Sequence, residues 1–90
     1  MSLSRNVTIV NKLGIHARPA TKLAKLSSQF KAKVTLCLAE KEVDASSIMG
    51  LMLLAGAQGQ EIEVKSEGDD AQAALDAICQ LIEDKFDEDE

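Results

Sequence analysis

The sequence predicts an α+β domain in which a four-stranded antiparallel sheet carries three helices on one face. Segments with the two-residue period of strands and segments with the helical period follow one another in the order βαββαβα. The stretch Glu61 to Glu67 alternates between charged and less polar residues, which indicates that one face of the sheet is in water. Because helices on the other face would bury every apolar stripe, we expect a two-layer, open-faced sandwich.

The first strand and helix are predicted from the first thirty residues. Asn6 to Val10 is expected to form a strand, and the loop Asn11 to Gly14 follows it. A helix is expected from Ala17 to Gln29, because small and apolar residues recur at helical spacing: Ala20, Leu23, Ala24, Ser27 and Phe30. In the strand, Val7 and Ile9 fall on one face, which we expect to be buried.

A hairpin and a short helix are expected in the middle of the chain. Val34 to Leu38 alternates as a strand does, and a turn at Ala39–Glu40 leads to a short strand from Lys41 to Asp44. The next segment, Ile48 to Leu54, is apolar and long enough for about two helical turns. Three residues that favour helix N-termini precede it: Asp44, Ser46 and Ser47.

The last strand and helix come after two glycines, Gly56 and Gly59. The strand is Glu61 to Glu67, and after Gly68 a helix is expected to start near Asp69 or Asp70 and to run to about Phe86. Its apolar face is predicted from Ala71, Ala74, Leu75, Ile78, Leu81 and Ile82. We expect one domain over residues 1–90, with a loose acidic tail at 87–90.

Composition excludes several classes of function. Tryptophan and tyrosine are absent and phenylalanine occurs only at Phe30 and Phe86, so stacking surfaces are nearly missing and nucleic-acid binding is disfavoured. Cys37 and Cys79 are far apart and there is one histidine, so neither a metal site nor a cofactor is expected. The first residues lack the apolar stretch of a signal peptide, and the run Ile48 to Ala57 is too short to cross a bilayer. We expect a cytoplasmic protein without membrane insertion.

The single histidine, His16, lies where a helix is expected to start. Gly14 permits a sharp loop before it, and Pro19 suits the first turn of a helix. The backbone N–H groups of Ala17 and Arg18 would be open to an anion, and the guanidinium of Arg18 provides a forked donor. A histidine in this position is often only a capping residue, but its neighbours together predict a site for a phosphoryl group.

The charges are distributed unevenly along the chain. Residues 1–39 carry seven basic and no acidic residues, a charge of +7, whereas residues 40–90 carry −12, which gives the net charge of −5. His16 therefore lies in a basic segment, together with Lys22 and Lys25, which we expect to face solvent on the first helix. This segment would attract acidic partners unless the fold interleaves the two halves.

The short helix offers a second candidate surface. It is apolar on all sides, which is more than one buried face requires, so we expect part of it to dock a partner: Ile48, Met49, Leu51 and Met52. Burial in the core is the alternative for each of them. Ser47 is expected mainly as the helix cap, although a phosphate there would place charge beside the apolar surface and block a partner.

These motifs and the order of elements resemble the HPr family of phosphocarrier proteins along nearly the whole chain. The stretch Gly14-x-His16-Ala17-Arg18-Pro19-Ala20 is specific to that family, and Ser47-Ile48-Met49-Gly50 supports the resemblance. The resemblance implies that His16 accepts a phosphoryl group on Nδ1 from enzyme I, which takes it from phosphoenolpyruvate, and passes it to an enzyme IIA domain. It also implies that Arg18 contacts the phosphate and that the helix after Ser47 docks partners.

Two branches of the family fit, the HPr of sugar uptake and its nitrogen-related paralogue NPr. Asn11 to Gly14, Gln60 to Val64 and Phe86 to Asp89 are more similar to NPr. In many members a kinase phosphorylates the serine matching Ser47, usually after a lysine, but here Ser46 precedes it. A serine kinase is therefore only a candidate partner.

We therefore predict a monomeric phosphoryl carrier that needs no metal of its own, in the nitrogen branch or, as the alternative, in sugar uptake. A different class remains open: a regulatory module that docks targets through the apolar helix, with His16 acting only as a cap. A free-standing hydrolase is disfavoured, because the chain lacks the second base and orienting acid that such an enzyme needs.

Overall fold

The structure is a computed structural model that describes residues 2–54 and 56–87. The predicted order of strands and helices is confirmed: β1 (Ser2–Thr8), α1 (Ala17–Ser27), β2 (Lys33–Leu38), β3 (Lys41–Asp44), α2 (Ile48–Leu54), β4 (Glu61–Glu67) and α3 (Ala71–Glu83), followed by a short turn, η1 (Lys85–Asp87). In the described part of the chain, no helix is long and apolar enough to cross a bilayer.

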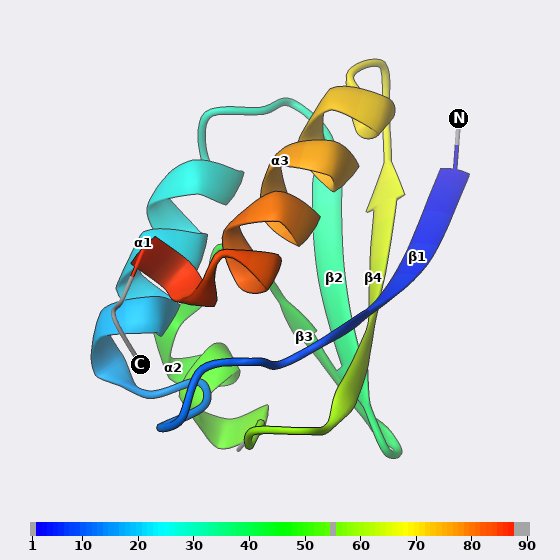
Figure 1. Ribbon diagram of the computed structural model, residues 1–90. Helices are drawn as coiled ribbons and strands as arrows, with labels where there is room; N and C mark the ends of the chain where they lie inside the picture. The colour runs from blue at the N-terminus through cyan, green and yellow to red at the C-terminus, as the bar shows by residue number, and fades with distance from the viewer. Residues whose placement is uncertain (1, 55, 88–90) are drawn as a thin grey trace.

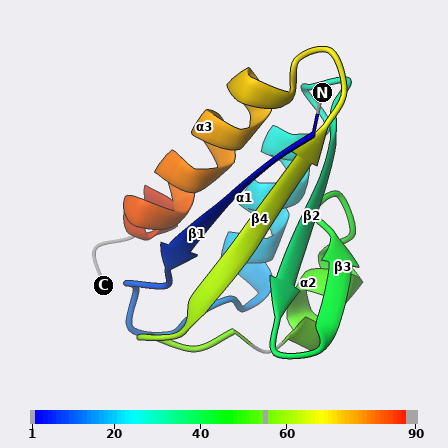
Figure 2. The ribbon, with the colours of Figure 1, turned by 90° about the vertical axis from the view of Figure 1, so that its right-hand side faces the viewer.

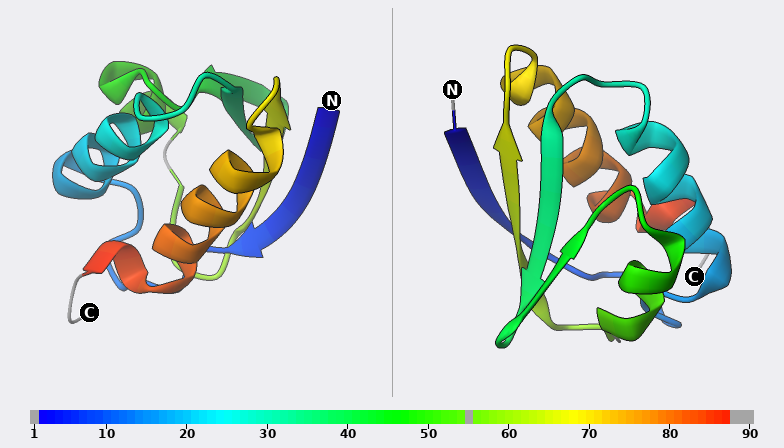
Figure 3. Two further views of the ribbon diagram at one scale, coloured as in Figure 1. Left: turned by 90° about the horizontal axis from the view of Figure 1, so that it is seen from above. Right: turned by 180° about the vertical axis from the view of Figure 1, so that it is seen from behind.

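The four strands form one antiparallel sheet with the spatial order β1-β4-β2-β3. β4 lies between β1 and β2, and its inward side chains Ile62 and Val64 stand opposite Val7 and Leu36. All three helices lie against one face of the sheet, and the other face is bare (Figures 1 and 2). Seen from above, sheet and helices form two layers (Figure 3). The predicted α+β sandwich is therefore confirmed.

The core lies between these two layers and is aliphatic apart from Cys79 and Phe86. Val7, Ile9, Leu36 and Ile62 are buried on the sheet side, as their spacing predicts. The bare face carries charged side chains, including the pair Lys65–Glu42, whose Nζ and Oε2 atoms are 3.4 Å apart. Both cysteines are free, with Cys79 buried and Cys37 half-buried.

The first strand differs from its predicted bounds. It begins at Ser2 and ends at Thr8, because it pairs with β4 along its whole length, from Ser2 opposite Glu67 to Thr8 opposite Glu61. The segment before Asn6 contains one large apolar residue, Leu3, so hydrophobic alternation does not reveal it. Ile9, beyond the strand, stays bonded to the segment that enters β4, since its N–H donates to the Gln60 carbonyl at 2.9 Å.

Both long helices end earlier than predicted. After Ser27 the chain of α1 continues with bonds that span three residues, such as the N–H of Phe30 to the Ser27 carbonyl at 3.2 Å. α3 ends at Glu83, and η1 has left-handed backbone angles, with φ of +56° at Phe86. Phe86 follows Ile82 by four residues, so the sequence keeps the helical period although the helix has ended. Residues 88–90 of the predicted tail lie outside the described residues.

Asp70 is the residue that precedes α3, in agreement with the expectation of Asp69 or Asp70. Its carboxylate accepts hydrogen bonds from the backbone N–H groups of Lys31 at 2.9 Å and Ala32 at 2.6 Å. These bonds lower the pKa of Asp70 below its usual value. The carboxylate thus joins the start of α3 to the segment that enters β2.

Candidate functional site

His16 is the residue at the N-terminus of α1, as predicted. Its backbone is extended (φ −117°, ψ −163°), and its carbonyl accepts the first helical hydrogen bond, from the N–H of Ala20 at 2.9 Å. The N–H groups of Ala17 and Arg18 come before that bond and have no acceptor within the helix, and Pro19 has no N–H to satisfy. The structure therefore places the histidine beside two backbone donors that the helix itself does not use.

The surroundings of His16 suit an anion. Its side chain is half-buried, whereas Ala17 and Arg18 are exposed. The first turn of α1 contains no acidic residue, so the positive end of the helix dipole is not neutralised there. No group of three His, Cys, Asp or Glu side chains within residues 2–54 and 56–87 is arranged to hold a metal ion. The donors available at this position are the backbone N–H groups and the Arg18 guanidinium.

The loop before His16 is held against the segment that follows α2 (Figure 1). The N–H of Ile15 donates to the carbonyl of Gly56 at 3.0 Å, and Ile15 is buried. Gly14 has a φ of +68°, and a Cβ built on it would lie 2.3 Å from the Gly56 carbonyl oxygen. Glycine is therefore required at Gly14 both for its backbone angle and for this close approach. The end of α2 and the start of α1 lie side by side as a result.

Ser47 caps α2, as expected. Its Oγ accepts a hydrogen bond from the N–H of Gly50 at 3.0 Å, and its carbonyl accepts the N–H of Leu51 at 2.9 Å. Asp44, also expected as a cap, instead bonds Ser46, whose N–H and Oγ lie 2.8 and 2.6 Å from its Oδ1. These bonds lower the pKa of Asp44. Ser47 is half-buried, so its hydroxyl already has a structural role.

The exposed apolar surface of α2 agrees with the prediction in part. Ile48 is 40 %, Met49 71 % and Met52 43 % exposed. The expectation for Leu51 was wrong: it is 0 % exposed, because it faces the core together with Leu54. Two other apolar residues are exposed although they were not predicted to be, Leu53 at 70 % and Leu13, in the loop before His16, at 68 %. The exposed positions 48, 49, 52 and 53 follow the helical period. Helical spacing from Met49 could therefore have predicted that Leu53 is exposed.

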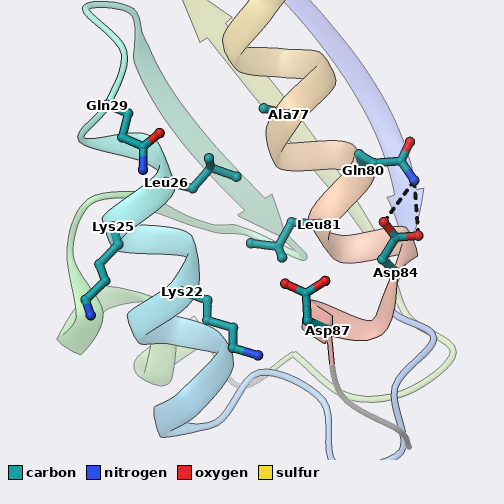
Figure 4. A pocket seen from close by; sticks show the side chains of 9 residues that line it. All are labelled: Lys22, Lys25, Leu26, Gln29, Ala77, Gln80, Leu81, Asp84 and Asp87. Atoms are coloured by element: carbon teal, nitrogen blue, oxygen red, sulfur yellow. Dashed lines mark hydrogen bonds between the residues drawn. The ribbon is translucent and has the colours of Figure 1, made fainter.

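Lys22 and Lys25 lie along a different feature, a groove of about 500 Å³ between α1 and α3 (Figure 4). The side chains of Leu26 and Leu81 also line it, and none of its lining residues belongs to α2. Lys25 is exposed, as expected, but Lys22 is half-buried and its Nζ donates to the Phe86 carbonyl at 2.5 Å. Lys22 was wrongly expected to face solvent, because the position of η1 is not evident from the helical spacing.

Comparison with known proteins agrees with this arrangement. The family model described as "PTS HPr component phosphorylation site" matches residues 3–84. The chain is 54% identical to the phosphocarrier protein NPr of Shewanella violacea, covering 96% of this chain and 94% of that protein. It is 45% identical to the phosphocarrier protein HPr of Xylella fastidiosa, covering 97% and 98% of the two chains.

A solved structure has the same fold. The crystal structure of HPr-C-His from Thermoanaerobacter tengcongensis superposes with a TM-score of 0.92 at 39% identity, covering 98% of this chain and 99% of that chain. The family match extends across the strands, the three helices and the segment that carries His16. The chain belongs to the HPr family of phosphocarrier proteins of the phosphotransferase system.

Proposed function

We propose that His16 is the phosphoryl acceptor and donor of this phosphocarrier. The observation that supports it best is the position of His16 as the residue before the first turn of α1, where backbone N–H groups have no acceptor within the helix. It is also the only histidine in the chain, so no other imidazole can take this role. The phosphoryl group comes from phosphorylated enzyme I, which is charged by phosphoenolpyruvate, and leaves to an enzyme IIA domain.

The transfer is an in-line displacement between two imidazoles. The Nδ1 electron pair of His16 forms a bond to phosphorus as the N–P bond of the donor histidine breaks, and the bonding electrons return to the donor ring. The Arg18 guanidinium and the N–H groups of Ala17 and Arg18 hold the phosphoryl oxygens in this step. The same displacement then runs from His16 to the acceptor, so the carrier contributes position and charge and needs no metal of its own.

Docking of enzyme I and enzyme IIA is assigned to the exposed apolar residues of α2 and its neighbouring loop: Leu13, Ile48, Met49, Met52 and Leu53. Their location supports this assignment, because the segment that follows α2 is bonded to the loop before His16 through Gly56 and Ile15. A partner that covers α2 would therefore also reach the imidazole. Phosphorylation of Ser47 by a serine kinase would remove the α2 cap and place charge on this surface.

We assign the carrier to the nitrogen-related branch, as a cytoplasmic monomer. The identity of 54% to the NPr of Shewanella violacea supports this branch. The branch assignment is tested by supplying the chain with phosphoenolpyruvate and the enzyme I of each branch in turn. The cognate enzyme I should phosphorylate the chain faster. Light scattering coupled to gel filtration tests the monomer.

The role of His16 is tested by replacing it. His16→Ala should take up no 32P from phosphoenolpyruvate and enzyme I, and circular dichroism should show that it folds. Retention of label at the wild-type rate would contradict the proposal. A regulatory module that works only by docking is the competing function, and it predicts that His16→Ala binds and controls its partners as the wild type does.

A further inference from the structure

Asn11 lies five residues before His16 and is unusual for a loop residue. Its side chain is 0 % exposed, although it is polar and belongs to a segment between β1 and α1. The side-chain Nδ2 donates to the carbonyl of Gly14 at 2.7 Å, and the backbone N–H of Gly14 donates to the Asn11 carbonyl at 3.2 Å. Burial of an amide requires such bonds, because an unsatisfied buried amide is costly.

The two bonds around Gly14 and Ile15 hold a single peptide unit at both ends. Its carbonyl, from Gly14, accepts the Asn11 amide, and its N–H, from Ile15, donates to the Gly56 carbonyl at 3.0 Å. One residue, the buried Ile15, connects this peptide unit to His16. A peptide unit next to a glycine at a φ of +68° has few steric barriers of its own to rotation, so the hydrogen bonds define its orientation.

We propose that Asn11 is a positioning residue for the phosphoryl transfer, because its amide fixes the Gly14–Ile15 peptide unit and thereby the place of His16 at the start of α1. The inference rests on the proposed role of His16. Asn11 does not touch the phosphoryl group in this account. It acts by limiting the positions of the imidazole, and misplacement of a reacting group by about 1 Å can reduce a rate on the order of 100-fold.

Asn11→Asp is the sharpest test, because it preserves the shape of the side chain while an ionised carboxylate has no N–H to donate to Gly14. Asn6→Asp, on the exposed β1 strand, makes the same chemical change away from the loop and is the matched control. We expect Asn11→Asp to reduce kcat of phosphoryl transfer from enzyme I about 10- to 100-fold. The KM of enzyme I for the carrier should change little, because the α2 surface of the variant is intact. A folded Asn11→Asp protein with wild-type kcat would overturn the proposal.

Hydrogen exchange of the Ile15 N–H gives a second measurement that does not depend on phosphorylation. Exchange should be slow in the wild type and in Asn6→Asp and selectively faster in Asn11→Asp, or in the milder Asn11→Ser if the first variant does not fold. Exchange in the wild type as fast as that of an unstructured peptide would overturn the positioning role. If the wild type accepts no phosphoryl group, the proposed function fails, and the exchange measurement still decides whether Asn11 holds the loop.

Discussion

Arg18 is the residue whose contribution to the chemistry can be tested with least disturbance of the fold. Its side chain is exposed at the first turn of α1, so Arg18→Ala should leave the melting temperature close to that of the wild type. A hydrogen bond to a charged group contributes about 1.5–3 kcal/mol, so kcat/KM of phosphoryl transfer should fall roughly 10- to 100-fold. Steady-state kinetics with enzyme I checks this expectation. Lys33→Ala, an exposed charge on β2, is the control, and an equal loss in both variants would argue against a specific phosphate contact.

Among single residues of the candidate site, the sequence indicated His16 and Arg18 but did not indicate Asn11. The histidine motif predicts the helix start and the exposed donors from local chemistry alone. The importance of Asn11 depends on its burial and on contacts between the loop and Gly56, which are separated by more than forty residues. Tertiary contacts of this kind are not encoded in local periodicity. The same limit explains why Lys22, bonded to the Phe86 carbonyl, was expected in solvent.

One side of α2 is exposed and is assigned to docking, whereas the other side is buried in the core. Substitutions on the exposed side should affect binding, and substitutions on the buried side should affect stability. Met49→Glu places a charge at a side chain that is 71 % exposed, so we expect weaker binding of enzyme I and an unchanged stability. Leu51→Ala leaves a cavity in the core and should cost about 2–5 kcal/mol of unfolding free energy. Titration calorimetry and urea denaturation measure the two effects. Wild-type affinity in Met49→Glu would remove Met49 from the interface.

The junction between α3 and β2 depends on the ionised form of Asp70. The N–H groups of Lys31 and Ala32 lower the pKa of this carboxyl in the folded protein. Its stabilising effect is therefore complete above the pKa of an unfolded aspartate and is lost as the pH falls through the lower folded pKa. Asp70→Asn should lower the melting temperature at neutral pH, and the difference from wild type should shrink in acid. Asp69→Asn, an exposed neighbour, is the control, and a difference independent of pH would contradict this explanation.

Element boundaries show which physical signals the sequence carries. The hairpin and β4 have clear alternation: β3 and β4 were predicted at their observed bounds, and β2 begins one residue earlier than predicted, at Lys33. β1 begins earlier because pairing with β4, rather than its own apolar residues, decides where it starts. α3 ends earlier because the chain reverses into the left-handed turn η1 after Glu83 and brings Phe86 back to the core. Long-range pairing and a backbone reversal without glycine are both invisible to periodicity.

For the whole molecule, η1 closes the end of the two-layer core. Phe86 is 0 % exposed and is the one aromatic side chain among the fully buried residues of the described core. Phe86→Ala should therefore cost roughly 3–5 kcal/mol of unfolding free energy, as large aromatic deletions in cores do. Urea denaturation at neutral pH measures it, with the exposed Lys85→Ala as the control. A loss no greater than that of Lys85→Ala would show that the turn does not contribute to the core.

The arrangement of layers followed from the sequence, because each strand and helix has one apolar face and a sandwich with one bare sheet face buries all of them. The relation between the two candidate surfaces did not follow. The N-terminus of α1 and the end of α2 meet through Ile15 and Gly56, whereas Lys22 and Lys25 line a groove with α3. Only the assembled fold distinguishes these two surfaces.

The carrier role of His16 is tested most directly by 31P NMR of the protein after incubation with phosphoenolpyruvate and enzyme I. We expect a phosphohistidine resonance in the wild type, its absence in His16→Ala, and faster formation with enzyme I of the nitrogen-related branch. The absence of this resonance from the folded wild-type protein with the enzyme I of either branch would contradict the carrier role of His16.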